Sequence, residues 1–541
     1  MTRGGGGDPR GAAGHKPAAF CFSPTFTEDA MTTTAPTTPA RMPPQIPYII
    51  GNEGCERFSF YGMRNILTVF MMTSLLLAIP EELRKAEAKE VFHTFVIGVY
   101  FFPLLGGWLA DRFFGKYPTI FWFSVIYCAG HACLALFENN LKGFYFGLFL
   151  ISLGSGGIKP LVTSFVGDQF DKSNRSLAQK VYDAFYWIIN FGSFFASLLM
   201  PVVLKQYGAS VAFGLPGLLM LVAPLILWSG RKKYVHQPAR GANPHSFLKV
   251  VLTALKAGGT GMAVAGLGLL LAAYALSQMA SLGFVAAVCL AMVLVMGFGG
   301  VGASLQLDRA RGVHPDEAVD GVRAVLRVLV LFALVTPFWS LFDQKASTWV
   351  LQADQMAKPE WFQSSMMQAL NPALVMILIP FNNLVLYPLI ARMGVQVTAL
   401  RRMGAGIALA GAAWIVAGVL QLWLDEGSTV SILWQMLPYV LLTLGEVLVS
   451  ATGLEFAYSQ APLSMKGTIM SFWNLSVTVG NLWVLLSNVS IKSPAALGVI
   501  QSSGYSETAC LMFFFAGFAL VAALLFALVA RRYPMQNHYR A

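Results

Sequence analysis

Long runs without a single charged residue are the feature that most limits what this chain can fold into. No Asp, Glu, Lys or Arg occurs in the intervals 257–307, 403–424 and 508–530. An α-helix needs about 20 consecutive apolar residues to cross a bilayer, and each interval is long enough to do so. Strands of a membrane β-barrel alternate apolar and polar residues, whereas these runs are apolar throughout. The sequence therefore predicts an all-α polytopic membrane protein.

The overall composition agrees with this prediction and narrows the possible partners. Of the 541 residues, 56% are hydrophobic and only 12% are charged, and the net charge is +11. The positive residues fall in loops between apolar runs, which indicates contact with anionic lipid rather than with nucleic acid. The six cysteines are scattered without the spacing of metal ligands. We therefore expect them to be packing residues, and we expect no disulfide, metal or other cofactor.

The apolar segments form two blocks of six around a middle pair, which predicts 14 membrane helices. Two such blocks are typical of transporters built from repeated halves. The middle pair is rich in Gly and Ala and has no ionisable residue in its membrane runs, so we expect it to pack outside the bundle and to carry no function. The predicted spans are 46–78, 90–111, 117–137, 143–166, 178–203, 208–230, 256–278, 280–305, 324–352, 368–392, 396–424, 429–459, 466–490 and 505–531.

The distribution of Lys and Arg predicts the orientation of the chain. Alternate connections carry basic clusters such as Arg231, Lys232 and Lys233, whereas the opposite loops hold few. By the positive-inside rule, both termini are expected in the cytoplasm and the protein in the inner membrane. Translation from Met1 or from Met31 is left open. The predicted organisation is a disordered tail rich in Gly, Thr and Pro (1–45), a six-helix bundle (46–230), a linker with the two inserted helices (231–323), a second six-helix bundle (324–531) and a C-terminal tail (532–541).

The few ionisable side chains inside the predicted spans are the strongest indication of function. A charge at the centre of a membrane helix costs about 2.5–3.5 kcal/mol, so such residues face a polar cavity or one another rather than lipid. His131 is also buried in a span, where we expect a hydrogen-bonded packing role. The others are Glu53, Glu56, Arg57, Arg64, His93, Lys159, Asp343, Glu446 and Glu455.

Helical spacing brings some of these residues together. Glu53, Arg57 and Tyr61 follow at intervals of four residues, so they share one stripe of the first helix. Glu446 and Glu455 are nine residues apart and point to opposite sides of their helix, so at most one can face a central cavity. One alternative is that these charges pair only to hold the helices together. The presence of cations and acids in both halves favours a binding site instead.

The residue types suit a ligand that carries separated charges of opposite sign. Arg57, Arg64 and Lys159 can hold a carboxylate, while Glu446 and Asn371 can hold an ammonium group. A zwitterion such as a short peptide has both groups.

The segment "EGCERFSFYG" (53–62) resembles the ExxERFxYYG motif of proton-dependent oligopeptide transporters, a branch of the major facilitator superfamily. Matches of this kind occur in order over both halves, and the two extra central helices fit bacterial members of that family. The other similar segments are "GGWLADRFFGKY" (106–117), "GIKPLVTSFVGDQF" (157–170), "FYWIINFGS" (185–193), "FWSLFDQKASTWVLQA" (338–353) and "GEVLVSATGLEFAYSQAP" (445–462).

The resemblance implies a role for most of the ionisable residues. Glu53, Glu56 and Arg57 would form the proton-coupling motif, with Glu56 as the proton carrier and Arg57 as its salt-bridge partner. Lys159 would complete this network and help to hold the peptide carboxylate. One departure is that the paired tyrosines of the motif appear as Phe60 and Tyr61, so one hydroxyl is missing.

The resemblance also implies a gate and a substrate site. Arg64 would pair with Asp343 to close the extracellular gate, and His93 would correspond to the proton-sensitive histidine of the animal transporters. We expect the glycines near 106 and 154–157 to allow close helix packing. The residues implied in substrate binding are Arg57, Tyr61, Arg64, Tyr100, Lys159, Asn190, Trp339, Asn371, Glu446, Ser450 and Trp473.

We therefore expect a monomeric proton-coupled symporter that imports di- and tripeptides by alternating access, and not an enzyme. The main alternative is a proton-coupled carrier of another small anion or amino-acid-like solute such as nitrate; Asn371 and Glu446 disfavour it because they suit an amino terminus. A membrane enzyme would need a clustered nucleophile and base, which the sequence does not offer. A non-transporting nutrient sensor would need a long structured tail or loop.

Overall fold

The computed structural model describes residues 41–170, 174, 177–239, 243–394, 396–460 and 465–534. Nearly all of them are helical, and β pairing in this part of the chain is limited to two isolated bridges, Arg311 with His314 and Ala357 with Ser431. Most of the predicted disordered tail (1–45) and of the C-terminal tail (532–541) lies outside the described residues. The predicted all-α fold is confirmed.

The first half of the molecule contains five helical stretches, the last of which comprises two helices. Gly208 has a φ of 82° and separates the two helices of this stretch, at the boundary between two of the predicted spans. The elements are α1 (Ile46–Phe70), η1 (Met71–Leu75), α2 (Glu81–Leu109), η2 (Ala110–Phe114), α3 (Lys116–Leu136), α4 (Leu141–Gly167) and α5 (Ala178–Ser229).

A linker with an inserted helix pair follows. Its elements are α6 (Phe247–Lys256), α7 (Thr260–Ser277), α8 (Met279–Leu282), α9 (Phe284–Gln306) and η4 (Leu307–Ala310). Apolar side chains of α9, including Ala286 and Cys289, pack against Ile97 of α2 in the first half and Leu482 of the second half. The inserted pair therefore lies on the outside of the bundle, as expected.

The second half repeats the helical design with more interruptions. Its elements are α10 (Asp316–Asp343), η5 (Gln344–Ala346), α11 (Thr348–Gln355), η6 (Ser364–Ala369), α12 (Leu370–Phe381), η7 (Asn382–Leu386), α13 (Tyr387–Arg392), α14 (Ala399–Asp425), η8 (Ile432–Gln435), α15 (Met436–Gln460), α16 (Lys466–Ile491), α17 (Pro494–Ser503) and α18 (Glu507–Arg532).

Helix boundaries differ from the predicted spans in two informative places. α2 begins at Glu81 rather than near residue 90, because the segment after Pro80 is rich in the good helix formers Glu, Lys and Ala. The prediction of one helix over 324–352 was wrong. α10 ends at Asp343, and a short 3₁₀ turn with a non-helical Ser347 precedes α11.

Twelve helical segments of the described chain are long and apolar enough to cross a membrane. One of these segments, Ala184–Ser229, contains the two helices joined at Gly208. α1 is not among the twelve, and it carries Glu53, Glu56, Arg57 and Arg64. The count of 14 membrane helices stays a prediction.

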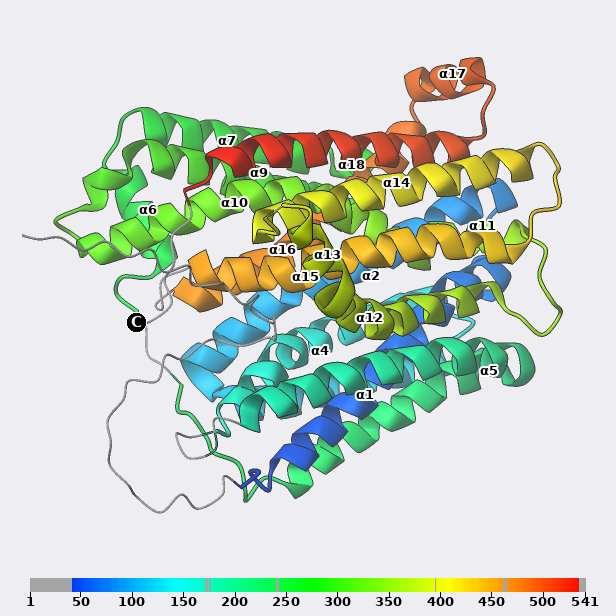
Figure 1. Cartoon of the computed structure of the whole chain (residues 1–541), viewed down its shortest axis with the longest axis horizontal. Coiled ribbons are helices and arrows are strands. Elements are labelled where there is room, and N and C mark those ends of the chain that lie inside the picture. The colour runs from blue at the N-terminus through cyan, green and yellow to red at the C-terminus, as the bar shows by residue number, and fades with distance from the viewer. Residues whose placement is uncertain are drawn as a thin grey trace, which may run out of the picture.

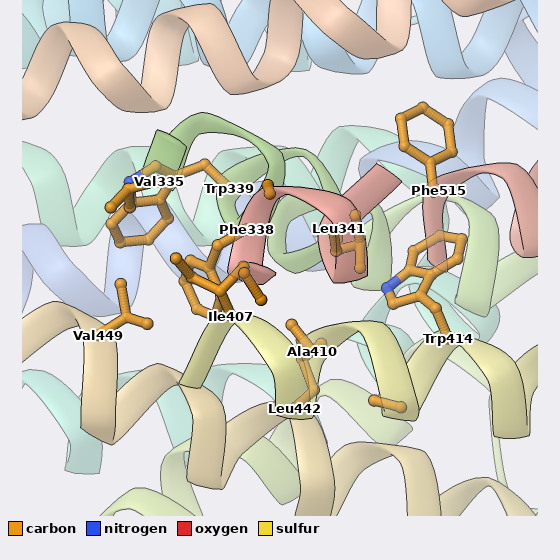
Figure 2. Close-up of a cluster of buried hydrophobic side chains, with 14 of the residues drawn as sticks. Val335, Phe338, Trp339, Leu341, Ile407, Ala410, Trp414, Leu442, Val449 and Phe515 are labelled. Carbon is orange, nitrogen blue, oxygen red and sulfur yellow. The ribbon is translucent and has the colours of Figure 1, made fainter. Parts of the chain in front are cut away.

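Each half has its own hydrophobic core. In the first half the core includes Met63, Phe70, Phe144 and Phe213. In the second half Trp414, Phe338 and Phe515 belong to one core, and Figure 2 shows these side chains on three different helices. The two described ends of the chain lie at the same end of the bundle, and we call the opposite end, where α11 and α17 lie, the distal end (Figure 1).

Candidate functional site

α1 places a compact ion-pair cluster inside the first half. The Nε atom of Arg57 lies 2.9 Å from Oε1 of Glu53 and 2.5 Å from Oε2 of Glu56. All three side chains are buried, with at most 4% of their surface exposed. We call these three residues the first charge cluster. Arg57 balances only one of the two carboxylates in charge, so the cluster is a natural place to hold a proton.

Lys159 of α4 approaches this cluster without joining it. The part of the chain that the structure describes contains no ion pair between Lys159 and either carboxylate of the cluster. Its Nζ atom lies 3.8 Å from the ring centroid of Tyr100 and 5.3 Å from that of Phe60. Such cation–π contacts are worth about 2 kcal/mol when desolvated. The phenylalanine that departs from the family motif thus offers a ring face to Lys159.

A second charge cluster lies in the other half. Nζ of Lys345, in η5, donates to Oδ1 of Asn371 over 2.9 Å. The Nδ2 group of the same amide donates to Oε2 of Glu446 over 2.6 Å and to Thr443 over 3.0 Å. Lys345 also lies over the ring of Phe342. We call Lys345, Asn371 and Glu446 the second charge cluster.

The second charge cluster lies within electrostatic reach of α1 residues that neighbour the first cluster, across the interface between the halves. Tyr61, on the stripe of the first cluster, interacts with Glu446 of the second. Lys345 of the second cluster interacts with Arg64 of α1. The site therefore has an acid–cation group on each side.

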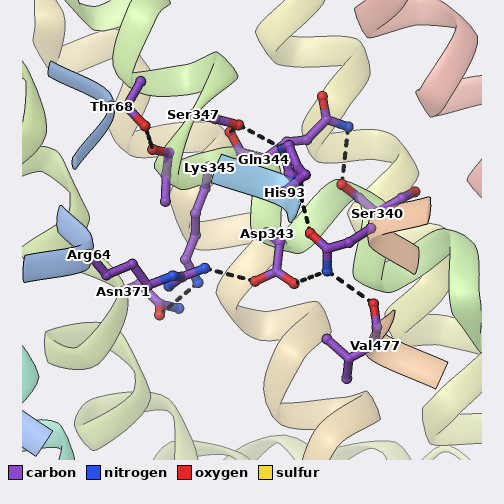
Figure 3. Close-up of polar contacts among 12 residues, drawn as sticks. Arg64, Thr68, His93, Ser340, Asp343, Gln344, Lys345, Ser347, Asn371 and Val477 are labelled. Carbon is purple, nitrogen blue, oxygen red and sulfur yellow. Dashed lines mark hydrogen bonds and ion pairs between the residues drawn. The ribbon is translucent and has the colours of Figure 1, made fainter. Parts of the chain in front are cut away.

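α1 is tied to the second half near its distal end by three polar contacts. Arg64 Nη2 donates to Asp343 Oδ1 over 2.8 Å. The hydroxyl of Thr68 donates to the carbonyl of Ala346 over 2.8 Å, and Gln368 donates to the carbonyl of Asn65 over 3.0 Å. Figure 3 shows the first two of these contacts side by side. The expected pairing of Arg64 with Asp343 is present.

His93 is linked to this ion pair through an asparagine. Asn481 Nδ2 donates to Asp343 Oδ2 over 2.8 Å and to the carbonyl of Val477 over 3.0 Å. Oδ1 of the same amide lies 2.6 Å from Nδ1 of His93, and Ser347 Oγ lies 3.0 Å from Nε2 of the imidazole (Figure 3). The amide hydrogens are already committed, so Oδ1 must accept, and Nδ1 of His93 must carry a hydrogen. Nε2 is then the nitrogen that gains a proton.

Two of the aromatic residues expected to line the substrate site, Trp339 and Trp473, lie together in the second half, whereas Tyr61 and Tyr100 lie on α1 and α2 of the first half. The rings of Trp339 and Trp473 are edge to face with centroids 5.8 Å apart, and both side chains are buried. Asn190 in the first half donates to the carbonyl of Tyr186. Ser450 lies one turn beyond Glu446 on α15 and is partly exposed, whereas Glu455 is exposed on the opposite side.

The sequence analysis missed two residues of this site. Lys345 is a charged residue only two positions beyond Asp343, so it could have been noticed within the segment 338–353. Asn481 gave no signal, because a single amide in an apolar helix has no recognisable pattern. Its importance comes from the packing of α16 beside α2.

Two helical halves that each place a charge cluster at their interface are typical of the major facilitator superfamily fold. The profile of the POT family matches residues 117–500. The chain belongs to the POT family.

The sequences of curated relatives are similar to that of this chain over most of its length. It is 32% identical over 431 residues to solute carrier family 15 member 2 of Rattus norvegicus, covering 74% of this chain and 53% of that protein. It is also 32% identical over 408 residues to peptide transporter 3 of Caenorhabditis elegans, covering 71% of this chain and 51% of that protein. The chain thus spans about half the length of the curated relatives it matches.

Solved structures of the family are similar over nearly the whole fold. The in meso crystal structure of the POT family transporter PepTSo has a TM-score of 0.90 and 69% identity, covering 92% of this chain and 100% of that one. A structure described as an auto-inhibited POT family peptide transporter has a TM-score of 0.90 and 62% identity, covering 92% of this chain and 99% of that one.

Proposed function

We propose that this protein is a proton-coupled symporter that imports di- and tripeptides across the inner membrane, with both termini in the cytoplasm and the distal end outside. The observation that carries this proposal is the pair of opposed charge clusters. Arg57 and Lys159 in the first half suit a peptide carboxylate, and Asn371 with Glu446 in the second suits an amino terminus. The names of the relatives, among them a peptide transporter, support the same substrate class.

Protons can supply the work that accumulation requires. One proton moving down about 100 mV contributes ~2.3 kcal/mol. One unit of pH difference adds ~1.4 kcal/mol. Together they support roughly 500-fold accumulation at one proton per peptide. The protein needs no other cofactor in this scheme.

The geometry suggests how a proton and a peptide exchange places. Protonation of Glu56 weakens its hold on Arg57 and frees the guanidinium for the peptide carboxylate. Protonation of His93 adds a hydrogen at Nε2 and a positive charge next to Asn481, which strengthens the donation of the Asn481 amide to Asp343 and so competes with Arg64 for that carboxylate. The halves then rock about the site, and proton release on the other side re-forms the ion pairs and displaces the peptide.

Uptake of labelled dialanine into proteoliposomes, with and without an inward proton gradient, tests the proposal. We expect gradient-dependent accumulation that unlabelled dipeptide blocks, that glycine and nitrate do not block, and that Arg57→Ala abolishes. The Glu56→Gln variant should lose gradient-driven uptake but keep counterflow exchange. If nitrate, and not dialanine, drives proton entry, the substrate assignment is wrong and the anion-carrier alternative takes its place.

A further inference from the structure

Glu56 belongs to a second polar face of α1 that looks into the first half. Asn52, Glu56 and Ser59 lie at i, i+4 and i+7, and each is at most 1% exposed. Ser59 Oγ lies 2.9 Å from Nε2 of His131 on α3. This face of α1 therefore looks toward α3, in addition to the contact that Glu56 makes with Arg57.

α3 presents two rings to this face in a fixed arrangement. Tyr127 and His131 lie one turn apart, and their rings stack with centroids 5.2 Å apart at 27°. On the other side, α4 comes so close that a Cβ at Gly154 would lie 2.7 Å from the Cβ of Tyr127. The predicted packing role of His131 is confirmed, and one thing it packs against is the Tyr127 ring.

The polar ends of these buried side chains lack protein partners. Among the described residues, neither the hydroxyl of Tyr127 nor the amide of Asn52 has a hydrogen-bond partner, and Glu56 has only its ion pair with Arg57. A buried polar group without a hydrogen-bond partner destabilises the folded protein by about 1–3 kcal/mol. Tyr127 lies within electrostatic reach of both Glu56 and Arg57. The unpaired donors therefore lie on the two helices that flank the carboxylate that the proposed mechanism protonates: Asn52 one turn before Glu56 on α1, and Tyr127 on α3.

We propose that Tyr127 and Asn52 are positioning residues for Glu56, and that they hydrogen-bond its carboxylate, directly or through a bridging water, when Arg57 turns to the substrate. The Tyr127 hydroxyl and the Asn52 Nδ2 group donate to the charged form. When Glu56 is protonated, its hydroxyl can donate to Asn52 Oδ1, so the amide serves both states. The stacked His131, held by Ser59, keeps the Tyr127 ring in place. This inference rests on the proposed role of Glu56 as proton carrier.

Other charged and titratable groups near Glu56 also influence its affinity for a proton. They are Glu53, Arg57 and Tyr61 on α1, Lys159 on α4, and Cys128 and His131 on α3. None of them is altered by a change at Tyr127 that removes only the hydroxyl. The ring and its stacking on His131 remain in Tyr127→Phe.

The test is the pH dependence of proton-driven dialanine uptake in Tyr127→Phe. Loss of a donor to the charged carboxylate favours its protonated form, so the midpoint of the pH profile should move about one unit to higher pH, a tenfold change in proton affinity. Counterflow exchange at fixed pH should keep its KM within about twofold, because the substrate contacts are unchanged. Asn52→Leu should move the midpoint less than Tyr127→Phe does, because the Asn52 amide pairs with both forms of the carboxyl group.

Tyr439→Phe is the matched control. Tyr439 is equally buried and its hydroxyl also lacks a partner among the described residues, but it packs on Trp349 in the second half. The pH profile of uptake in Tyr439→Phe should have the same midpoint as that of the wild type. A folded Tyr127→Phe protein with an unmoved midpoint, or one moved to lower pH, would overturn the proposal.

A readout without substrate separates this proposal from the proposed function. Infrared difference spectra can follow the protonated carboxyl band that Glu56→Gln removes. In Tyr127→Phe this band should persist to higher pH than in the wild type, whether or not the protein transports dialanine. If the band does not shift although wild-type uptake is proton-driven, the positioning role is wrong and the transport function stands.

Discussion

Arg64 of α1 and Asp343 of α10 are 279 positions apart in the chain, yet their side chains meet over 2.8 Å between the two halves. Both are buried, and the second oxygen of Asp343 is occupied by Asn481. The carboxylate thus joins one helix of the first half to two of the second. The ion pair therefore connects three helices near the distal end.

Breaking this ion pair should open the distal end. Removal of one partner of a buried pair leaves an unpaired charge and costs about 3–5 kcal/mol. Arg64→Gln and Asp343→Asn should each increase the rate at which a thiol reagent labels a cysteine placed at Ala346. In the double variant, the increase in labelling should be smaller than the sum of the two single increases. Simple additivity in this double-mutant cycle would mean that the two side chains do not interact in the membrane.

Asn481→Ala should uncouple His93 from Asp343. We expect gradient-driven uptake to fall about tenfold or more, since loss of a hydrogen bond to a charged group costs about 1.5–3 kcal/mol, while counterflow exchange falls less. Asn488→Ala is the control, because Asn488 lies two turns further along α16, is buried and has no contact with the histidine. Equal losses in both variants would show that only the packing of α16 matters.

Lys345→Met should weaken substrate binding. Without the ammonium group, the Asn371 amide is no longer held in the orientation that points Nδ2 at Glu446. We expect the KM for dialanine to rise about tenfold, with a smaller change in the maximal rate. Lys358→Met, at a lysine that contacts exposed Asp354, should leave the KM unchanged. An unchanged KM in Lys345→Met would remove Lys345 from the substrate site.

The linker contains a histidine pair that should make its attachment sensitive to pH. His245 Nδ1 and His314 Nδ1 are 2.9 Å apart, so one must donate and the other accept, and His314 Nε2 also contacts Thr253. Burial and the nearby His245 and Lys249 lower the pKa of His314. The folded form therefore binds a proton less readily than the unfolded chain, and this contribution to stability is complete above about pH 6.5 and is lost as the pH falls below it.

Thermal unfolding in detergent at pH 5.5 and 7.5 checks this expectation. The rise in Tm between the two pH values should be smaller in His314→Gln than in the wild type. Lys249→Gln should leave the histidine contact in place. An identical pH response in wild type and His314→Gln would show that the pair does not stabilise the linker.

Gly106 and Gly107 offer a direct test of helix packing. A Cβ at Gly106 would lie 2.2 Å from the carbonyl oxygen of Gly156 on α4, whereas a Cβ at Gly107 would meet nothing within 4 Å. Gly106→Ala should destabilise the protein by about 1–3 kcal/mol or more through overpacking. Gly107→Ala should have the stability of the wild type, measured as Tm. Equal Tm values for the two variants would contradict the close approach of α2 and α4.

Much of the fold and part of the site were predictable from the sequence, because membrane spans and buried charges leave local patterns. The apolar segments marked most helices, and the spacing of Glu53 and Arg57 predicted their contact on one stripe. The break after Asp343 coincides with the polar residues Asp343, Gln344 and Lys345, but such residues within a span do not by themselves show whether the helix continues through them. That break matters because it carries Lys345 into the site.

Local sequence patterns could not predict contacts between helices that are far apart in the chain. Lys159 was expected to complete the carboxylate network, but its Nζ lies over the ring of Tyr100. The final position depends on how α4 packs against α2: the glycines predicted a close helix approach but not which helices would meet. The same applies to Asn481, whose partners lie on α2 and α10.

The inserted helix pair makes the two lateral seams of the molecule unequal. α9 packs across the seam where α2 meets α16, whereas the seam formed by α5 and α12 lacks such a cover within the described chain. The proposed rocking of the halves would therefore deform the surrounding acyl chains mainly on one flank. We then expect bilayer thickness and lipid packing to affect the transport rate mainly through one side of the molecule. In proteoliposomes of graded acyl-chain length, the turnover should change while the affinity for substrate does not.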